Sequence, residues 1–115
     1  MIPGGLIIEM TEEQVSKSYL DMTLAIMKEF GAEIEQDKRQ IRIADKPYAP
    51  IAYTVESDWS SASYYYAIAA IAEEATIELT HFNQKSLQAD SAMSILGRRL
   101  GVVSRVVDNL SLIHI

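Results

Sequence analysis

A serine, a lysine and a second serine follow one another at the start of a predicted helix. Ser16, Lys17 and Ser18 could hold an anion, because the first turn of a helix has free N–H groups and the positive end of the helix dipole. A hydroxyl and an ammonium group would add further donors. The alternative is that Ser16 only caps the helix, since serine is among the preferred N-cap residues. The residues alone favour capping, with phosphate binding as the second interpretation.

An aspartate stands in front of the next predicted helix. Asp58 is followed by Ser60 and Ser61 in the first turn. A carboxylate at this position satisfies free N–H groups of the helix and needs no substrate, so capping is the expected role. Three consecutive tyrosines, residues 64–66, lie further along the same helix. Because successive residues point in different directions around a helix, we expect them to pack in a core rather than stack together on a ligand.

The residue inventory excludes several other kinds of chemistry. The chain has 115 residues and no Cys, so it has neither a thiolate nucleophile nor a cysteine-based metal site. Its two histidines, His81 and His114, lack the spacing of a metal site. No glycine-rich phosphate loop precedes a helix, and no Ser-His-Asp arrangement can be argued. We therefore predict no metal site.

Charge and hydropathy restrict the partners. Lys and Arg number 10 against 16 Asp and Glu, and a net charge of -6 offers no basic surface for nucleic acid. The longest uncharged apolar run, residues 64–72, is far shorter than the roughly 20 residues that a helix needs to span a bilayer. Residues 1–10 lack the basic start of a secretory signal. We expect a cytoplasmic protein that binds neither nucleic acid nor membrane.

The hydrophobic pattern predicts alternating helices and strands. The predicted strands are 6–10, 32–36, 40–44, 51–55, 75–80 and 102–107, and the predicted helices are 16–30, 59–74 and 87–100. Gly31 is expected to stop the first helix. The helix 59–74 has no charge between its ends, so it should be buried on every side. A chain this short cannot easily enclose a helix, and we expect more protein to surround it.

Two stretches together resemble the 5-enolpyruvylshikimate-3-phosphate synthase family. Residues 16–24 read S-K-S-Y-L-D-M-T-L, where the family has S-K-P-Y-I-D-x-T-L, and residues 55–64 read V-E-S-D-W-S-S-A-S-Y, where it has V-E-G-D-A-S-S-A-S-Y. Order and separation both match, and residues 88–90 are similar to the Q-G-D segment of the family. The resemblance covers nearly the whole chain up to Asn109. The departures are Ser18 in place of proline, Ser57 in place of glycine and Trp59 in place of alanine.

This resemblance implies a fold and a reaction for a longer protein. The expected fold class is α+β, with βαβαββ repeat units whose sheets face outwards and whose helices are buried, here as an incomplete domain. The family transfers the enolpyruvyl group of phosphoenolpyruvate to the 5-hydroxyl of shikimate 3-phosphate and releases phosphate, in the shikimate pathway of aromatic amino acid and chorismate biosynthesis. It uses no cofactor. The implied partners are the two substrates, and the full enzyme is expected to be a two-domain monomer.

The resemblance also assigns roles to individual residues. The serine of S-K-P-Y falls on Ser16 and its tyrosine on Tyr19, and both are implied to contact shikimate 3-phosphate. The aspartate of V-E-G-D falls on Asp58, a candidate for a catalytic or positioning role. The N-terminal lysine and arginine of the family, its S-S-Q triplet, and the acids and lysine of the other domain have no counterparts in these 115 residues. We therefore expect the chain alone to be inactive.

The organisation of the chain and two other functions stay open at this point. Residues 1–109 are expected to be a partial enolpyruvyl transferase domain, about one repeat unit plus the start of another. Residues 110–115 have no helix or strand context and are expected to be a non-native tail, with a genuine terminal strand as the alternative. The chain could instead be a piece of the related UDP-N-acetylglucosamine enolpyruvyl transferase, or a non-catalytic αβ module that binds a protein through exposed apolar helix faces.

Overall fold

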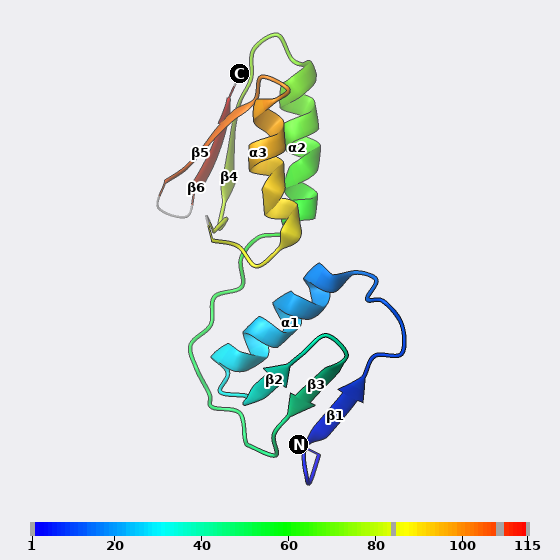
Figure 1. Ribbon diagram of the computed structural model, residues 1–115. Helices are drawn as coiled ribbons and strands as arrows, with labels where there is room; N and C mark the ends of the chain where they lie inside the picture. Colours follow the sequence, from blue (N-terminus) through cyan, green and yellow to red (C-terminus); the bar gives the residue numbers. More distant parts are fainter. Residues whose placement is uncertain (1, 84, 108–109, 115) are drawn as a thin grey trace. The chain divides into compact units, whose positions relative to one another are not determined.

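The structure consists of two compact units, which are described one at a time. The computed structural model (Figure 1) describes residues 2–83, 85–107 and 110–114. The first unit is Met1–Tyr53 and the second is Thr54–Ile115. Helices and antiparallel sheets occur in both units, so the predicted α+β class is confirmed.

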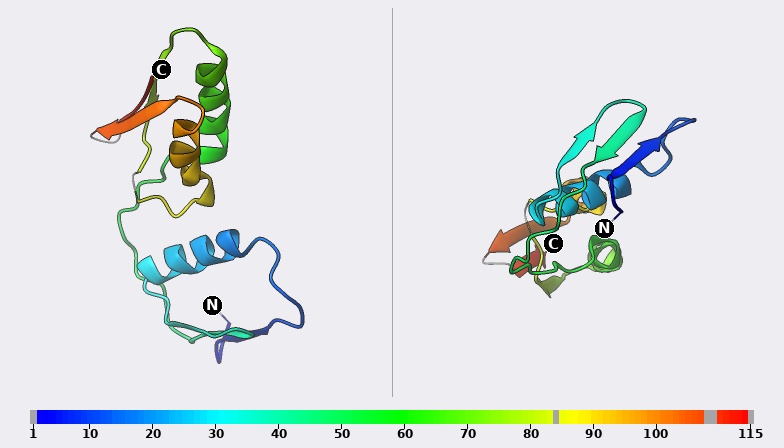
Figure 2. Two further views of the ribbon diagram at one scale, coloured as in Figure 1. Left: turned by 45° about the horizontal axis from the view of Figure 1, so that its top comes forward. Right: turned by 90° about the horizontal axis from the view of Figure 1, so that it is seen from below.

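The first unit is one helix on a three-stranded sheet. Its elements are β1 (Leu6–Glu9), α1 (Lys17–Glu29), β2 (Ile34–Gln36) and β3 (Gln40–Ile43). Strands β1 and β2 both pair antiparallel with β3, which gives the order β1-β3-β2. Figure 2 (left) shows this sheet nearly edge-on with α1 over one face. Leu24 of α1 and Ile41 of β3 are the buried hydrophobic residues that this arrangement encloses.

The end of α1 agrees with the sequence. Gly31 has a φ of 86°, a left-handed conformation that glycine adopts without a Cβ clash. Its N–H donates to the Lys28 carbonyl at 2.9 Å, and the Ala32 N–H donates to the Met27 carbonyl at 3.0 Å. These bonds use carbonyls that the helix end would otherwise leave unpaired. The prediction that Gly31 stops the helix is therefore confirmed.

Strands β2 and β3 form an antiparallel hairpin and are slightly shorter than the predicted strands 32–36 and 40–44. Asp37 organises its turn, because one carboxylate oxygen accepts from the N–H groups of Arg39 and Gln40, each at 2.8 Å. The same two bonds, that from Arg39 first, hold the pKa of Asp37 below its ordinary value. An aspartate that binds the backbone two and three residues further on favours a turn over continued strand.

The second unit places two helices on one face of another three-stranded sheet. Its elements are α2 (Trp59–Ile71), β4 (Thr76–Thr80), the 3-10 helix η1 (Ala89–Ala92), α3 (Met93–Arg98), β5 (Val103–Val107) and β6 (Leu110–His114). The sheet order is β4-β6-β5, and both pairs are antiparallel. Figure 1 shows α2 and α3 side by side against this sheet.

The core of the second unit comes largely from one side of α2. Trp59, Ala62, Tyr66 and Ala69 recur at helical spacing and are buried with Phe82 and Val102. The Trp59 and Phe82 rings meet edge to face, with centroids 4.9 Å apart. Where a Cβ on Gly97 of α3 would stand, the Tyr66 ring lies 2.7 Å away. A glycine there lets α3 approach α2 closely.

Within this unit α2 is buried on one side only, and its burial on the other side by further protein stays a prediction. The exposed fractions are 72% for Tyr64, 53% for Ile68 and 86% for Ile71. The unit has only two layers, so its sheet and α3 cover one side of α2 and leave the other apolar side in contact with solvent. No helix in the described part of the chain is both long enough and apolar enough to cross a membrane.

Three further sequence predictions differ from the structure. Residues 51–55 do not form a strand, and the whole of 44–58 is without helix or strand, because these residues pair with no strand of either sheet. The predicted helix 87–100 is replaced by η1 and the short helix α3. Residues 110–115 were expected to lack strand context, yet Leu110–His114 is the central strand β6, since β4 and β5 both pair with it. That the tail is non-native stays a prediction.

Candidate functional site

The expected capping role of Ser16 is wrong. Ser16 occupies the N-cap position of α1, but its φ of 63° and ψ of 41° are left-handed, and its side chain makes no capping hydrogen bond. A capping serine has extended backbone angles, which direct the hydroxyl to the N–H groups of the first turn. Here the Ser16 carbonyl, rather than the hydroxyl, accepts from the Tyr19 N–H at 3.1 Å. The Ser16 hydroxyl therefore does not cap the helix.

The backbone of Ser16 is strained in a way that is common at binding sites. A non-glycine residue in the left-handed region costs about 1–3 kcal/mol, and such residues cluster at ligand clamps and active sites. His81 is the other non-glycine residue with positive φ in the described part of the chain. His81 carries no predicted role, whereas Ser16 does. The conformation of Ser16 is thus an independent structural reason to consider it a binding residue.

Tyr19 shares the first turn of α1 with Ser16. The hydrogen bond from the Tyr19 N–H to the Ser16 carbonyl brings these two predicted site residues together at the start of α1. The Tyr19 side chain is 62% exposed, and its backbone carbonyl accepts from the Thr23 hydroxyl at 2.8 Å. The exposed Tyr19 phenol and the Ser16 hydroxyl, which makes no capping bond, can each donate a hydrogen bond to an anionic or hydroxylated ligand.

Lys17 is less available to a ligand than the sequence suggested. Its ammonium group lies 2.5 Å from a carboxylate oxygen of Asp21, one turn along the helix. The bond from Lys17 is the main cause that holds the pKa of Asp21 below its ordinary value. Both side chains are exposed, so this pair is weak and a stronger anion could compete for the lysine.

The capping role of Asp58 is confirmed. Its carboxylate accepts from the N–H groups of Ser60 at 3.0 Å and Ser61 at 3.2 Å, and from the Ser61 hydroxyl at 2.8 Å. The Ser61 hydroxyl, followed by the Ser60 N–H, holds the pKa of Asp58 below its ordinary value of 3.8. Asp58 is therefore ionised at neutral pH and is suited to act as a fixed negative charge or acceptor rather than as a proton donor.

The sign of the pH effect follows from this lowered pKa. The folded state favours the ionised carboxylate, so the Asp58 cap contributes stability above the ordinary value of 3.8. The contribution is lost as the pH falls through the lower folded-state pKa.

Asp58 is in the second unit, while Ser16 and Tyr19 are in the first. Within the first unit the structure brings Ser16 and Tyr19 together with each other.

The sequence did not reveal which residues hold Asp58 in place. The amide of Gln88 binds the backbone on both sides of Asp58, accepting from the Trp59 N–H at 2.8 Å and donating to the Ser57 carbonyl at 3.0 Å. The neighbouring Asp90 accepts from the Ser60 hydroxyl. Residues 55–64 and 88–90 were separate matching segments in the sequence. No signal in the sequence indicated that these two segments meet in space.

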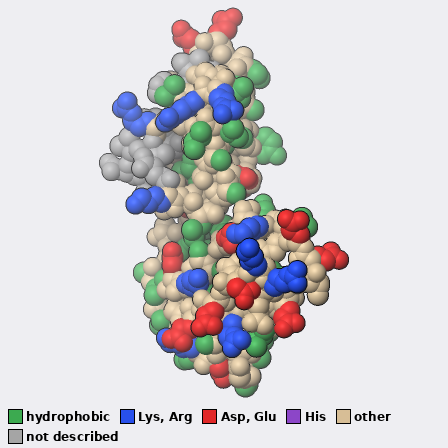
Figure 3. Space-filling view, in the orientation of Figure 1, with side chains coloured by type: hydrophobic (Ala, Val, Ile, Leu, Met, Phe, Trp, Pro, Cys, Tyr) green, Lys and Arg blue, Asp and Glu red, His purple; other side chains and the backbone are tan. Residues whose placement is uncertain are grey.

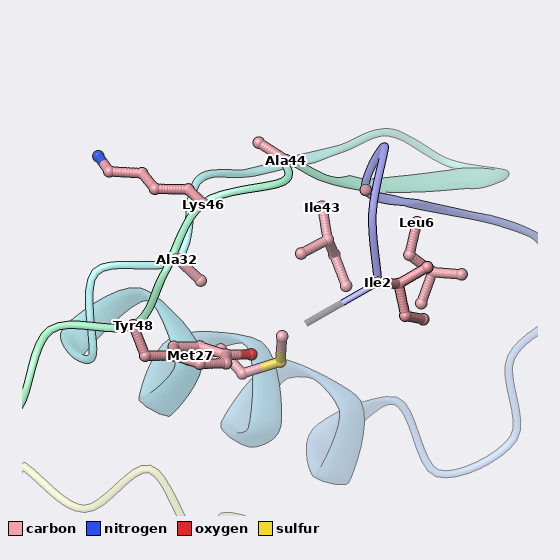
Figure 4. A pocket seen from close by; sticks show the side chains of 9 residues that line it. Ile2, Leu6, Met27, Ala32, Ile43, Ala44, Lys46 and Tyr48 are labelled. Atoms are coloured by element: carbon pink, nitrogen blue, oxygen red, sulfur yellow. The ribbon is translucent and has the colours of Figure 1, made fainter.

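A hollow in the first unit is unsuited to a phosphate. Figure 4 shows Leu6, Met27 and Ile43 around it, and the cavity is about 170 Å³. Its single lysine, Lys46, points away from the apolar side chains and lies 2.6 Å from Glu33. An apolar cavity whose only cation is already paired would not compensate an anion for lost water. Neither Ser16 nor Tyr19 lines it, so it does not belong to the predicted site.

The face of the first unit drawn in Figure 3 lacks a large basic area. On the face of the first unit drawn in Figure 3, Lys and Arg side chains alternate with Asp and Glu. Among the described residues, no group of three or more His, Asp or Glu side chains is placed to hold a metal ion. The chemistry available in the described units is therefore hydroxyl, phenol and amide hydrogen bonding with individual ionised side chains.

Comparisons with known proteins agree with the resemblance in the sequence. Residues 3–112 match the family model described as EPSP synthase (3-phosphoshikimate 1-carboxyvinyltransferase). A Bacteroides fragilis protein named 3-phosphoshikimate 1-carboxyvinyltransferase is 41% identical over 109 residues, which are 94% of this chain and 27% of that protein. Proteins of the same name from Cronobacter sakazakii and Photorhabdus laumondii are 38% and 39% identical, over 88% and 89% of this chain. The chain spans about a quarter of the length of these relatives.

Proposed function

The chain belongs to the EPSP synthase family, and on this basis we propose that it is part of an enzyme that transfers the enolpyruvyl group of phosphoenolpyruvate to the 5-hydroxyl of shikimate 3-phosphate. The reaction releases phosphate and belongs to the shikimate pathway. The observation that carries the proposal is the match of residues 3–112 to this family, together with relatives that share the activity in their name. The proposal includes a cytoplasmic location and a two-domain monomer for the full enzyme.

In this proposal the chain supplies one side of a substrate site. Ser16 and Tyr19 donate hydrogen bonds to shikimate 3-phosphate from the first turn of α1. Three features support these roles: the Ser16 hydroxyl makes no cap bond, the Ser16 backbone is left-handed, and Tyr19 is exposed beside it. The free N–H groups and dipole of the same helix end favour an anionic ligand. Asp58 is a fixed charge with a positioning role rather than a proton donor.

The repeat organisation is also a proposal. The first unit has the order β-α-β-β, and the second, up to residue 107, has α-β-α-β when η1 is counted with α3. Both orders agree with part of a βαβαββ unit. We assign residues 1–109 to a partial enolpyruvyl transferase domain on this ground. A chain with a quarter of the length of its relatives offers one wall of an interdomain cleft, and enclosure by a second wall is what excludes water during such reactions. The isolated chain is therefore expected to be inactive.

Neither alternative function has comparable support. The relatives named above carry the shikimate name and not that of a nucleotide-sugar transferase. The exposed apolar side of α2 fits an interaction module, but it fits an incomplete domain equally well.

A chimeric enzyme tests the proposed function. The matching segment of the Bacteroides fragilis relative would be replaced by residues 3–112 of this chain, with the unaltered relative as the control. We expect the folded chimera to release phosphate from phosphoenolpyruvate when shikimate 3-phosphate is present, and not with UDP-N-acetylglucosamine. The 115-residue chain alone should release none. A chimera that folds, as judged by circular dichroism, but acts on neither substrate or only on the nucleotide sugar would contradict the proposal.

A further inference from the structure

We infer that Gln88 is a positioning residue, which fixes the backbone on both sides of Asp58 and thereby fixes the place of the Asp58 carboxylate. The clamp is a feature of the 115-residue chain itself. Its bearing on catalysis rests on the proposed function, in which Asp58 is a candidate site residue. It goes beyond the family resemblance, which assigned Gln88 no role.

The geometry that carries this inference is a pair of hydrogen bonds from one amide. The Gln88 side-chain oxygen accepts from the Trp59 N–H at 2.8 Å, and its nitrogen donates to the Ser57 carbonyl at 3.0 Å. Ser57 and Trp59 are the two neighbours of Asp58 in the chain. Both bonds are partly buried, where competition from water is reduced. The backbone around Asp58 is therefore held before and after the aspartate by the same side chain.

The pair of bonds requires a primary amide at the end of a long side chain. An amide presents one acceptor and one donor group side by side, which matches a backbone carbonyl and N–H separated by one residue. A glutamate could accept from Trp59 but, when ionised, could not donate to the Ser57 carbonyl. A methionine of similar size could do neither. The position of Gln88 therefore requires the hydrogen-bonding groups of an amide and not only a side chain of this size.

The segment in front of α2 depends on this clamp because it has no regular structure. Residues 44–58 form neither helix nor strand, so no backbone ladder fixes them. Two further hydrogen bonds run through Ser57, whose N–H donates to the His81 carbonyl at 2.8 Å and whose hydroxyl donates to the Thr80 carbonyl at 2.9 Å. Both lie before Asp58. Gln88 supplies the contact that spans the aspartate.

Gln88 is itself held by a neighbouring serine. Its backbone N–H donates to the Ser86 hydroxyl at 3.0 Å, and that hydroxyl donates to a carboxylate oxygen of Glu56 at 2.6 Å. On the other side, Asp90 accepts from the Ser60 hydroxyl in the first turn of α2. The segment that carries Gln88 is therefore joined to the segment around Asp58 at successive points, which places the amide reproducibly.

Two substitutions of Gln88 and one control test the inference in the 115-residue chain by NMR. Gln88→Met removes both bonds at similar side-chain volume, and Gln88→Glu keeps the acceptor and removes the donor. Ser57→Ala is the matched control, since it removes a hydrogen bond from the same segment and leaves the amide clamp intact. The readouts are hydrogen exchange at the Trp59 N–H and the pH titration of the Asp58 carboxylate. Fluorescence of Trp59, the single tryptophan, reports whether the core is kept.

In Gln88→Met we expect Trp59 N–H exchange to become about tenfold faster, as the loss of one hydrogen bond implies. The pKa of Asp58 should rise towards its ordinary value, because Ser60 and Ser61 would no longer be presented to it in a fixed place. Gln88→Glu should keep Trp59 protected, and because its added carboxylate also repels that of Asp58, the Asp58 titration is compared in Gln88→Met, while Ser57→Ala should change neither. An unchanged Trp59 exchange rate and Asp58 titration in Gln88→Met, or an equal change in Ser57→Ala, would overturn the inference. The test uses no transferase activity, so its failure would leave the proposed function untouched.

Discussion

Replacing Trp59 with alanine should lower the free energy of unfolding of the second unit by about 3–5 kcal/mol, the range for a large aromatic residue removed from a core. Trp59 is 2% exposed and meets Phe82 edge to face. The substitution would remove the largest side chain of the core cluster and leave a cavity that two helices on one sheet cannot easily collapse to fill. The indole N–H is buried without a partner, and removing it offsets part of this loss.

The control for Trp59 lies on the opposite side of the same helix. Tyr64 is largely exposed, so Tyr64→Ala should change stability by no more than about 0.5 kcal/mol. Urea denaturation followed by circular dichroism measures both variants. Trp59→Ala also introduces the residue that the family pattern has at position 59. Equal stability of Trp59→Ala and the unaltered chain would mean that the core around Phe82 is not built on the tryptophan.

Replacing Gly5 with alanine should have an effect of similar size on the first unit. Gly5 has a φ of 81°, and a Cβ there would lie 2.5 Å from the Ile43 carbonyl oxygen at the end of β3. The left-handed backbone and the forced displacement of β3 together should cost about 2–5 kcal/mol. Because the obstacle is backbone rather than a flexible side chain, a local rotamer change cannot relieve it.

The substitution Gly4→Ala separates the cost of the left-handed backbone from the cost of the clash with β3. Its φ of 85° is nearly the same, but a Cβ there would meet no atom within 4 Å. Gly4→Ala should therefore show only the conformational cost, about 1–2 kcal/mol. Hydrogen exchange of the β3 amides in both variants, combined with denaturation midpoints, measures the difference. If Gly4→Ala and Gly5→Ala were equally destabilising, contact between the N-terminal turn and β3 would not be what requires glycine.

Local sequence signals predicted those elements that depend on neighbouring residues. Gly31 stops α1 by its own left-handed conformation, and Asp37 forms its turn through bonds to residues two and three positions away. Asp58 caps α2 through the next two serines. In each case the groups that decide the structure lie within a few residues, so the sequence carries the information directly.

Features that depend on distant partners could not be predicted in this way. Residues 51–55 have the composition of a strand but pair with no neighbour, and Leu110–His114 is a strand because β4 and β5 both pair with it. The left-handed backbone of Ser16 contradicts its preference for capping, and no local residue signals it. The Gln88 clamp joins residues about 30 positions apart. The sequence thus named the candidate site residues, while the contacts that hold them, such as the Gln88 clamp, could be found only in the structure.

We propose that the Ser16 hydroxyl, at the N-cap position of α1, holds shikimate 3-phosphate. Kinetics of the Bacteroides fragilis chimera with Ser16→Ala test it most directly, with Ser18→Ala as a hydroxyl control in the same turn. A hydrogen bond to a charged group contributes about 1.5–3 kcal/mol, so the KM for shikimate 3-phosphate should rise at least about tenfold in Ser16→Ala, with the KM for phosphoenolpyruvate little changed. Equal KM values for shikimate 3-phosphate in Ser16→Ala, Ser18→Ala and the unaltered chimera would contradict the claim.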